Sequence, residues 1–188
     1  AFRDAEFNQD GGSAAVSGPL AVSGQTAGRL TQSGAAATAS VIGPVRVAGG
    51  AAEAVLDLDG AAWTGKGTTA VASPGRAVVG FGPATAARFA GNVAVRGGSG
   101  FDTLLAGATV RFDQNLSINL GPGAGQVNLD PGARVGGALS VTGGTGADDV
   151  SLDGVAVAGA TRILTGGGAD TLTVDRGAAF GGAFSADL

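Results

Sequence analysis

Three stretches of the chain combine glycine and aspartate at spacings that could support hydrogen bonding within a turn or the binding of a metal ion. Residues 97–105 and 143–151 fit the pattern G-G-x-G-x-D-x-U-x, in which U is a large apolar residue, and residues 165–173 fit it except at the first position. An aspartate in such a corner has two uses. It accepts hydrogen bonds from its own turn, or it gives carboxylate oxygens to a hard cation such as Ca²⁺.

These nonapeptides resemble the calcium-binding repeats of haemolysin-type (RTX) secreted proteins. The resemblance implies that glycine carbonyls and the aspartate of one turn bind Ca²⁺ together with the neighbouring turn. The residues that it designates as ligands are Asp102, Asp148, Asp170, Gly98, Gly100, Gly144, Gly146 and Gly168.

The chain departs from that family in the number of motifs. The family stacks two nonapeptides in each coil, whereas this chain has one per repeat, and residues 120–126 between the first two motifs contain no aspartate. Ca²⁺ takes six to eight oxygen ligands. We therefore favour the interpretation in which Asp102, Asp148 and Asp170 hydrogen-bond their own turns, and calcium, the one cofactor considered, is the alternative.

The motifs belong to an internal repeat with a spacing of 22–26 residues. Each copy begins with an apolar anchor residue, followed by a small residue and a strand-like alternation. An alternating apolar pair recurs about 15 residues after the anchor. Alternation over so few residues indicates strands and not helices. The anchors are Val16, Val41, Trp63, Phe89, Phe112, Val135, Val157 and Phe180.

This repeat predicts an all-β fold, a right-handed single-stranded parallel β-helix of about eight coils with three short strands per coil. Three differently directed strands share each period, so each strand can pair only with its equivalent in the next coil. We expect one domain over residues 1–188, with a partial coil over 1–15, less regular coils over 16–88 and regular coils over 89–188. A bulging loop is expected within 65–75, and Gly91, Gly137, Gly159 and Gly182 should occupy a crowded corner.

The composition argues against several classes of function. The chain has no Cys or His, and its net charge is -4. That balance disfavours nucleic acid as a partner, and no apolar run is long enough to insert in a membrane. We predict no catalytic residues and no enzyme activity, and a polysaccharide lyase or hydrolase is the least favoured alternative. The cations are interpreted as scattered solvating charge, with Arg96, Arg111, Arg134, Arg162 and Arg176 as examples.

Apolar residues at both ends of the repeat array suggest self-association. Solenoids normally need polar capping repeats, and we recognise none here. We expect head-to-tail stacking into a filament or surface layer, or alternatively a calcium-stabilised rod segment of a larger adhesin or secreted RTX-like protein. The composition resembles the glycine- and valine-rich repeat proteins that bacteria secrete or display. This implies an extracellular or cell-surface location and a cell-surface polysaccharide as a second partner. The residues expected at the contact are Phe2, Phe7, Phe180, Phe184 and Leu188.

Overall fold

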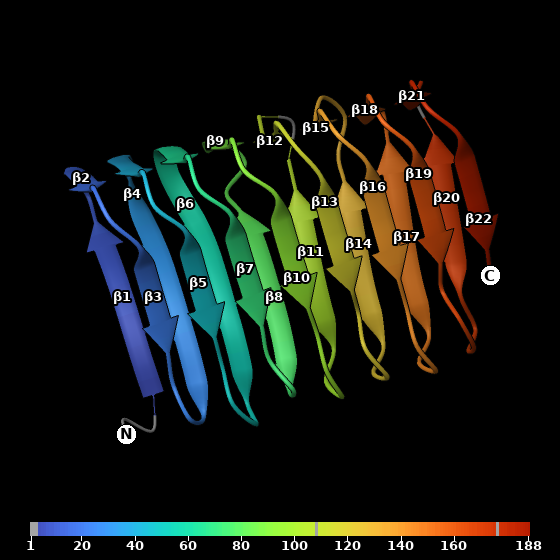
Figure 1. Cartoon of the computed structure of the whole chain (residues 1–188), viewed down its shortest axis with the longest axis horizontal. Helices are drawn as coiled ribbons and strands as arrows, with labels where there is room; N and C mark the ends of the chain where they lie inside the picture. Colours follow the sequence, from blue (N-terminus) through green and yellow to red (C-terminus); the bar gives the residue numbers. More distant parts are fainter. Residues whose placement is uncertain (1–3, 108, 176) are drawn as a thin grey trace.

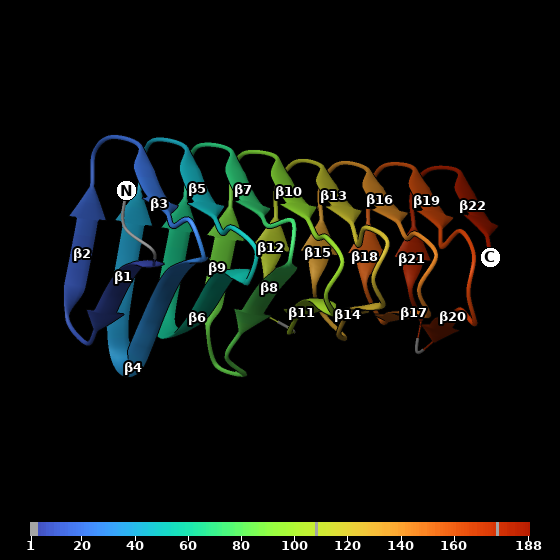
Figure 2. The ribbon, with the colours of Figure 1, turned by 90° about the horizontal axis from the view of Figure 1, so that it is seen from below.

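The computed structural model describes residues 4–107, 109–175 and 177–188. Within them the chain winds through about eight turns of a right-handed parallel β-solenoid and contains strands but no helix. Figures 1 and 2 show the coils stacked side by side, with the two chain ends at opposite ends of the stack. The predicted fold class is confirmed.

Each coil has three faces, and all strand pairs are parallel. Two long strands, β4 (Ala27–Val41) and β6 (Glu53–Gly65), bend around one corner and contribute to two faces. Face 1 contains the first parts of β4 and β6 together with β1 (Asp4–Asp10), β8 (Arg76–Phe81), β11 (Asp102–Ala106), β14 (Gly125–Leu129), β17 (Asp148–Asp153) and β20 (Thr171–Asp175).

Face 2 contains the second parts of β4 and β6 and a set of shorter strands. These are β2 (Ser13–Val16), β9 (Ala86–Phe89), β12 (Arg111–Phe112), β15 (Arg134–Val135), β18 (Ala156–Val157) and β21 (Ala179–Phe180). Face 3 is a separate sheet made of β3 (Leu20–Ser23), β5 (Val45–Ala48), β7 (Thr69–Ala72), β10 (Val93–Arg96), β13 (Leu116–Asn119), β16 (Leu139–Thr142), β19 (Thr161–Leu164) and β22 (Phe184–Asp187).

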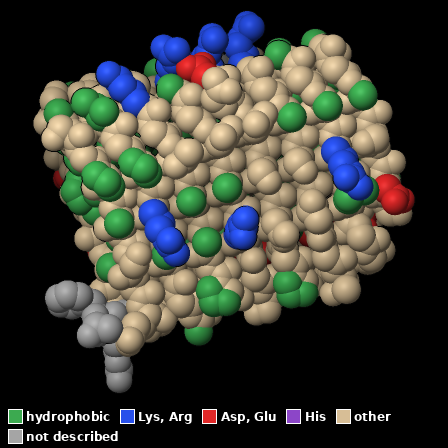
Figure 3. Space-filling model, viewed as in Figure 1, with side chains coloured by type: hydrophobic (Ala, Val, Ile, Leu, Met, Phe, Trp, Pro, Cys, Tyr) green, Lys and Arg blue, Asp and Glu red, His purple; other side chains and the backbone are tan. Residues whose placement is uncertain are grey.

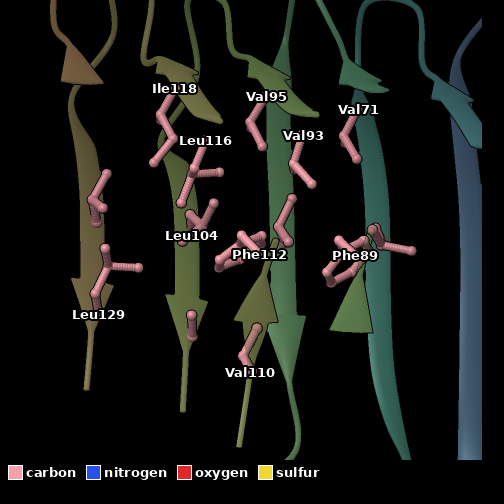
Figure 4. Packing of buried hydrophobic residues seen from close by; sticks show 14 of the residues in the cluster. Val71, Phe89, Val93, Val95, Leu104, Val110, Phe112, Leu116, Ile118 and Leu129 are labelled. Carbon is pink, nitrogen blue, oxygen red and sulfur yellow. The ribbon is translucent and has the colours of Figure 1, made fainter. Parts of the chain in front are cut away.

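The core consists of columns in which equivalent residues of successive coils stack. Phe89 pairs with Phe112, and the column continues through Val135, Val157 and Phe180, as the repeat predicts. The rings of Phe89 and Phe112 lie parallel, with centroids 5.4 Å apart. Figure 4 shows these side chains pointing into the interior between the faces. Burying each such side chain contributes roughly 1.5–3 kcal/mol.

The sequence prediction is wrong at the third anchor. Gly65, and not Trp63, pairs with both Val41 and Phe89. Trp63 is 1% exposed. A Cβ added at Gly65 would lie 3.3 Å from the indole Nε1 of Trp63. The Trp63 ring therefore covers the inner position that Gly65 leaves empty, and the large side chain shifts by two residues along the strand.

The predicted loop within 65–75 is also wrong. Three residues separate the end of face 2 from the start of face 3 in every coil, including the one between Gly65 and Thr69. The extra residues of the early coils lie instead at the corner between faces 1 and 2, where the register of β4 and β6 shifts between Gly34 and Thr38. The corner between faces 2 and 3 thus has a fixed length, and the other two corners absorb the variation.

Glycine at the fixed corner is required by the close approach of successive coils. The N–H of Gly159 donates to the carbonyl of Gly137 at 2.9 Å. A Cβ added at Gly159 would lie 2.7 Å from the carbonyl carbon and oxygen of Gly137. A Cβ at Gly182 would likewise meet Gly159 at 2.7 Å. The predicted crowding at this corner is confirmed.

We expect Gly159→Ala to lower the free energy of unfolding by about 1–3 kcal/mol, because the methyl group forces two backbone segments apart. Gly107→Ala is the matched control, since nothing lies within 4 Å of a Cβ at that position. Urea denaturation of both variants measures the difference. Equal stabilities of the two variants would contradict the proposed crowding.

Candidate functional site

The predicted aspartates lie in one column at the start of face 1. Asp102 pairs with Gly125, Gly125 pairs with Asp148, and Asp170 follows in the next coil. Asp148 and Asp170 are therefore neighbours, whereas Gly125 separates Asp102 from Asp148. The three glycine–aspartate corners share a position in the coil, but only two of their carboxylates lie in adjacent coils.

Asp102 is buried and fixed by two backbone groups. Its exposed fraction is 0%. Its Oδ2 accepts a hydrogen bond from the N–H of Gly98 in its own turn at 3.1 Å, and its Oδ1 accepts one from the N–H of Ala77 in the preceding coil at 2.6 Å. The carboxylate therefore closes its own corner and also joins two coils.

Asp148 and Asp170 form a related pair. Oδ2 of Asp148 accepts a hydrogen bond from the N–H of Gly144 at 3.3 Å, and Oδ1 of Asp170 accepts one from the N–H of Asp148 at 2.9 Å. Own-turn hydrogen bonding is thus present at Asp102 and Asp148. The bond of Asp170 reaches the neighbouring coil instead.

The glycines of these corners are explained by backbone stacking. A Cβ at Gly98 would collide with the carbonyl of Pro74, and one at Gly144 would collide with the carbonyl of Gly121. Gly146 and Gly168 meet the coil below in the same way, and Gly168 also has φ of +135°. A Cβ at Gly100 would lie 3.0 Å from the carbonyl oxygen of Gly75. The glycine pattern therefore has a structural cause that does not involve a cation.

The donor set for a metal ion is small. In residues 4–107, 109–175 and 177–188, no group of three or more acidic side chains is arranged to hold a metal ion. Six or more oxygens are usual for Ca²⁺. Carbonyl oxygens would have to supply most of them beside Asp148 and Asp170. Calcium binding stays a prediction of the sequence.

Burial dominates the electrostatics of this column. It raises the pKa of Asp102 to about 6, against a partial lowering by the N–H groups of Ala77 and Gly98. Burial also raises the pKa of Asp148, where the N–H of Gly144 opposes the change and the negative charge of Asp170 adds to it. These carboxyl groups hold protons more strongly than exposed aspartates do.

The residues predicted for self-assembly lie at the two ends of the stack. Phe7 is half-buried in β1, and Phe180 is half-buried in β21, with its ring centroid 4.7 Å from that of Phe184. Phe184 and Leu188 are exposed by 42% and 60%. Phe2 lies outside the described residues. Among the described strands, those of the first and last coils pair on one side only.

Sequence reasoning missed a column of cations on face 2. Arg111 pairs with Arg88 on one side and with Arg134 on the other. Arg111 and Arg134 are therefore part of an ordered row and not scattered charge. The signal was available in the sequence, because each of the three arginines immediately precedes an anchor and they recur every 23 residues. Arg176 lies outside the described residues.

Fold and site together define a parallel β-solenoid whose corners are closed by glycine and aspartate. The chain matches no protein-family model, no curated protein and no solved structure in the comparisons made. In the described part of the chain, no helix is long and apolar enough to span a membrane.

We expect Asp102 to make stability depend on pH. Because the folded-state pKa of about 6 exceeds the ordinary value of 3.8, the folded chain binds this proton more tightly than the unfolded chain does. The contribution of Asp102 to stability is therefore full below about pH 4 and is lost as the pH rises through 6. Urea denaturation from pH 4 to pH 7 should show this component in the wild type and not in Asp102→Asn. Parallel profiles for the two proteins would contradict the assignment.

Proposed function

We propose that the protein is a non-catalytic structural β-solenoid that self-associates end to end, with a second copy of the chain supplying the next coil at each edge. One observation carries the proposal. The inward-facing residues of the first and last coils occupy the same columns, so one end of the stack continues the other. A heterologous head-to-tail contact with almost no rotation builds an open filament.

The columns match in apolar character on all three faces. Following the pairing from coil to coil, Leu172 shares a column with Phe7. Phe180 shares one with Val16. Phe184 shares one with Leu20, and Ala186 with Val22. One column differs, since Val174 continues towards Gln9, whose side-chain amide donates to Thr38 and Gly12.

Apolar side chains exposed at the last coil would supply the driving force for the end-to-end contact. Val174 is 45% exposed, whereas Leu152, its partner in the preceding coil, is 0% exposed. Phe184 is 42% exposed, whereas Leu139, in the same column two coils earlier, is 1% exposed. A stacked copy would bury these side chains at roughly 25 cal/mol per Å² of apolar surface. It would also pair the free strand edges.

Charge opposes the contact and makes it sensitive to salt. Asp10 ends β1 and Asp175 ends β20, and continuing the register places them in one column across the junction. Like charges in adjacent strands repel. Salt screens exposed charges that lie several ångströms apart. Assembly should therefore strengthen as ionic strength rises.

The extracellular location is part of the same proposal. It is supported by the resemblance of the composition to glycine- and valine-rich repeat proteins that bacteria secrete or display. A rod without an enzymatic role suits a surface layer or an appendage. The adhesin and enzyme alternatives gain no specific support from the site geometry.

Substitution of Gly18 should affect assembly without affecting folding. Nothing lies within 4 Å of a Cβ added at Gly18, whereas a Cβ at the equivalent Gly43 would lie 2.5 Å from the carbonyl of Gly18. In the proposed filament, the corner at Gly182 of a second copy covers Gly18 in that manner. We expect Gly18→Ala to leave the melting temperature unchanged and to abolish filaments. Gly107→Ala, at an open position away from both ends, should leave filaments intact.

Negative-stain microscopy and sedimentation velocity across a range of salt concentrations measure the outcome. The wild type should form fibres of uniform width, more extensively at high salt. Discrete particles of wild-type protein under every condition would refute end-to-end assembly. Equal fibre formation by Gly18→Ala would refute the proposed junction.

A further inference from the structure

Charged residues are distributed unevenly over the faces of the solenoid. Among the charged residues on the outward side of face 1, acidic ones outnumber the two arginines, Arg29 and Arg76. The acidic ones include Glu6, Asp10, Asp57, Asp59, Asp130, Asp149, Asp153 and Asp175. Face 2 carries Arg88, Arg111 and Arg134 in three successive coils, and Lys66 lies at the corner that follows β6. Figure 3 shows basic side chains gathered along the upper edge of the molecule, with one acidic group among them. The chain as a whole has a net charge of -4, so the positive face is a local feature.

One carboxylate holds two of the arginines in line. Oδ2 of Asp113 accepts a bond from Nε of Arg88 at 2.7 Å, and its Oδ1 accepts one from Nε of Arg111 at 2.5 Å. The side chain of Asp113 is only 13% exposed, whereas those of the two arginines are 60% and 59% exposed. Burial raises the pKa of Asp113, but Arg111 and Arg88 lower it further, so that the net shift is downward. Asp113 therefore stays ionised, and each guanidinium keeps donors free towards solvent.

The third arginine borders a hollow in the surface. Arg134 makes no ion pair with any acidic side chain in the described part of the chain. After Arg134, the same column continues as Ala156 and Ala179. The step from long to short side chains leaves a pocket of about 280 Å³, lined by residues that include Arg111, Arg134, Ala156 and Gly181.

We infer that face 2 binds an extended acidic polysaccharide that runs along the solenoid axis, with its carboxylate or sulfate groups paired to the guanidinium groups of Arg88, Arg111 and Arg134. Successive coils are about 4.8 Å apart, so the cations form a row with regular spacing that suits a polymer with repeated negative charges. Arginine binds carboxylates and similar oxyanions through paired N–H donors. The hollow beside Arg134 provides room for a sugar ring next to the last of these guanidinium groups.

The same observations favour a polysaccharide over a single-stranded nucleic acid. Nucleic-acid grooves combine cations with aromatic rings on which bases stack. Beside the arginines of face 2, Trp63, Phe89 and Phe112 are each 1% exposed and face the core, and the half-buried Phe180 lies two coils beyond Arg134. The inference concerns the side of the rod and not the coil edges, so it is independent of the proposed end-to-end assembly.

The test compares two triple variants that remove the same charge from different faces. The first is Arg88→Gln with Arg111→Gln and Arg134→Gln on face 2. The matched control is Arg46→Gln with Arg96→Gln and Arg162→Gln, all at exposed positions of face 3. Binding to polygalacturonate, heparin, neutral dextran and poly(dT) is measured by calorimetry from 25 to 200 mM salt. All chains carry Gly18→Ala, which keeps the measurement independent of filament formation.

The wild-type face should bind at least one of the two acidic polysaccharides and not dextran, with an affinity that falls as salt rises. Polygalacturonate and heparin distinguish carboxylate from sulfate as the recognised group. We expect the face 2 variant to bind at least tenfold more weakly. Its slope of log K against log salt should be shallower by about 2, because three contacts are lost and each contributes about 0.7. The face 3 variant should change affinity less than twofold.

Asp113→Asn gives a second, independent readout. Removing this negative charge while keeping a hydrogen-bond acceptor should raise the affinity for the polysaccharide severalfold, whereas a merely structural role would lower it or leave it unchanged. Three results would overturn the inference: no binding to either polysaccharide at 25 mM salt, equal losses in the two triple variants, or tighter binding to poly(dT) than to the polysaccharides.

Discussion

Every strand between the first and last coils finds its hydrogen-bond partners in the coil before it and the coil after it, and the rest of the structure depends on that constraint. Buried backbone N–H and C=O groups must be paired. Since three differently directed strands share each coil, only the equivalent strand one coil away can pair with them. Register then places like residues on like residues, as with Phe89 and Phe112 in the core and Gly137 and Gly159 at a corner.

The same constraint explains where the chain tolerates irregularity. The corner between faces 2 and 3 keeps one length throughout, because a change there would shift the register of face 3 and turn inward side chains outward. Extra residues occur at the corner between faces 1 and 2, as at Gly34 to Thr38, and the corner between faces 3 and 1 varies by one residue. A large side chain can also stand at a neighbouring inward position of the same strand. The ring of Trp63, for example, covers the inner position that Gly65 leaves empty.

Much of this was predictable from the sequence, and the failures have physical causes. Alternation and the anchor spacing predicted the strands, their parallel pairing and the crowded glycine corner. Trp63 was predicted as the third anchor because Trp63 and Gly65 both point inward, and a search for apolar residues selects the tryptophan and not the glycine. The glycine–aspartate pattern was ambiguous because backbone crowding and cation binding both select glycine. The arginine column was missed because a spacing of 23 residues gains meaning only once the coil register is known.

The proposed end-to-end assembly and polysaccharide binding should respond to salt in opposite directions, because the first would bring Asp10 towards Asp175 and the second would pair opposite charges. The two properties nevertheless reinforce each other. In a filament, the row from Arg88 to Arg134 would recur once per copy, separated by coils in which the same column holds uncharged residues such as Ala156 and Ala179. A polymer long enough to cross a junction would contact two rows, and the second contact would form at high effective concentration. Weak binding by one copy would thus become strong retention by an assembled rod.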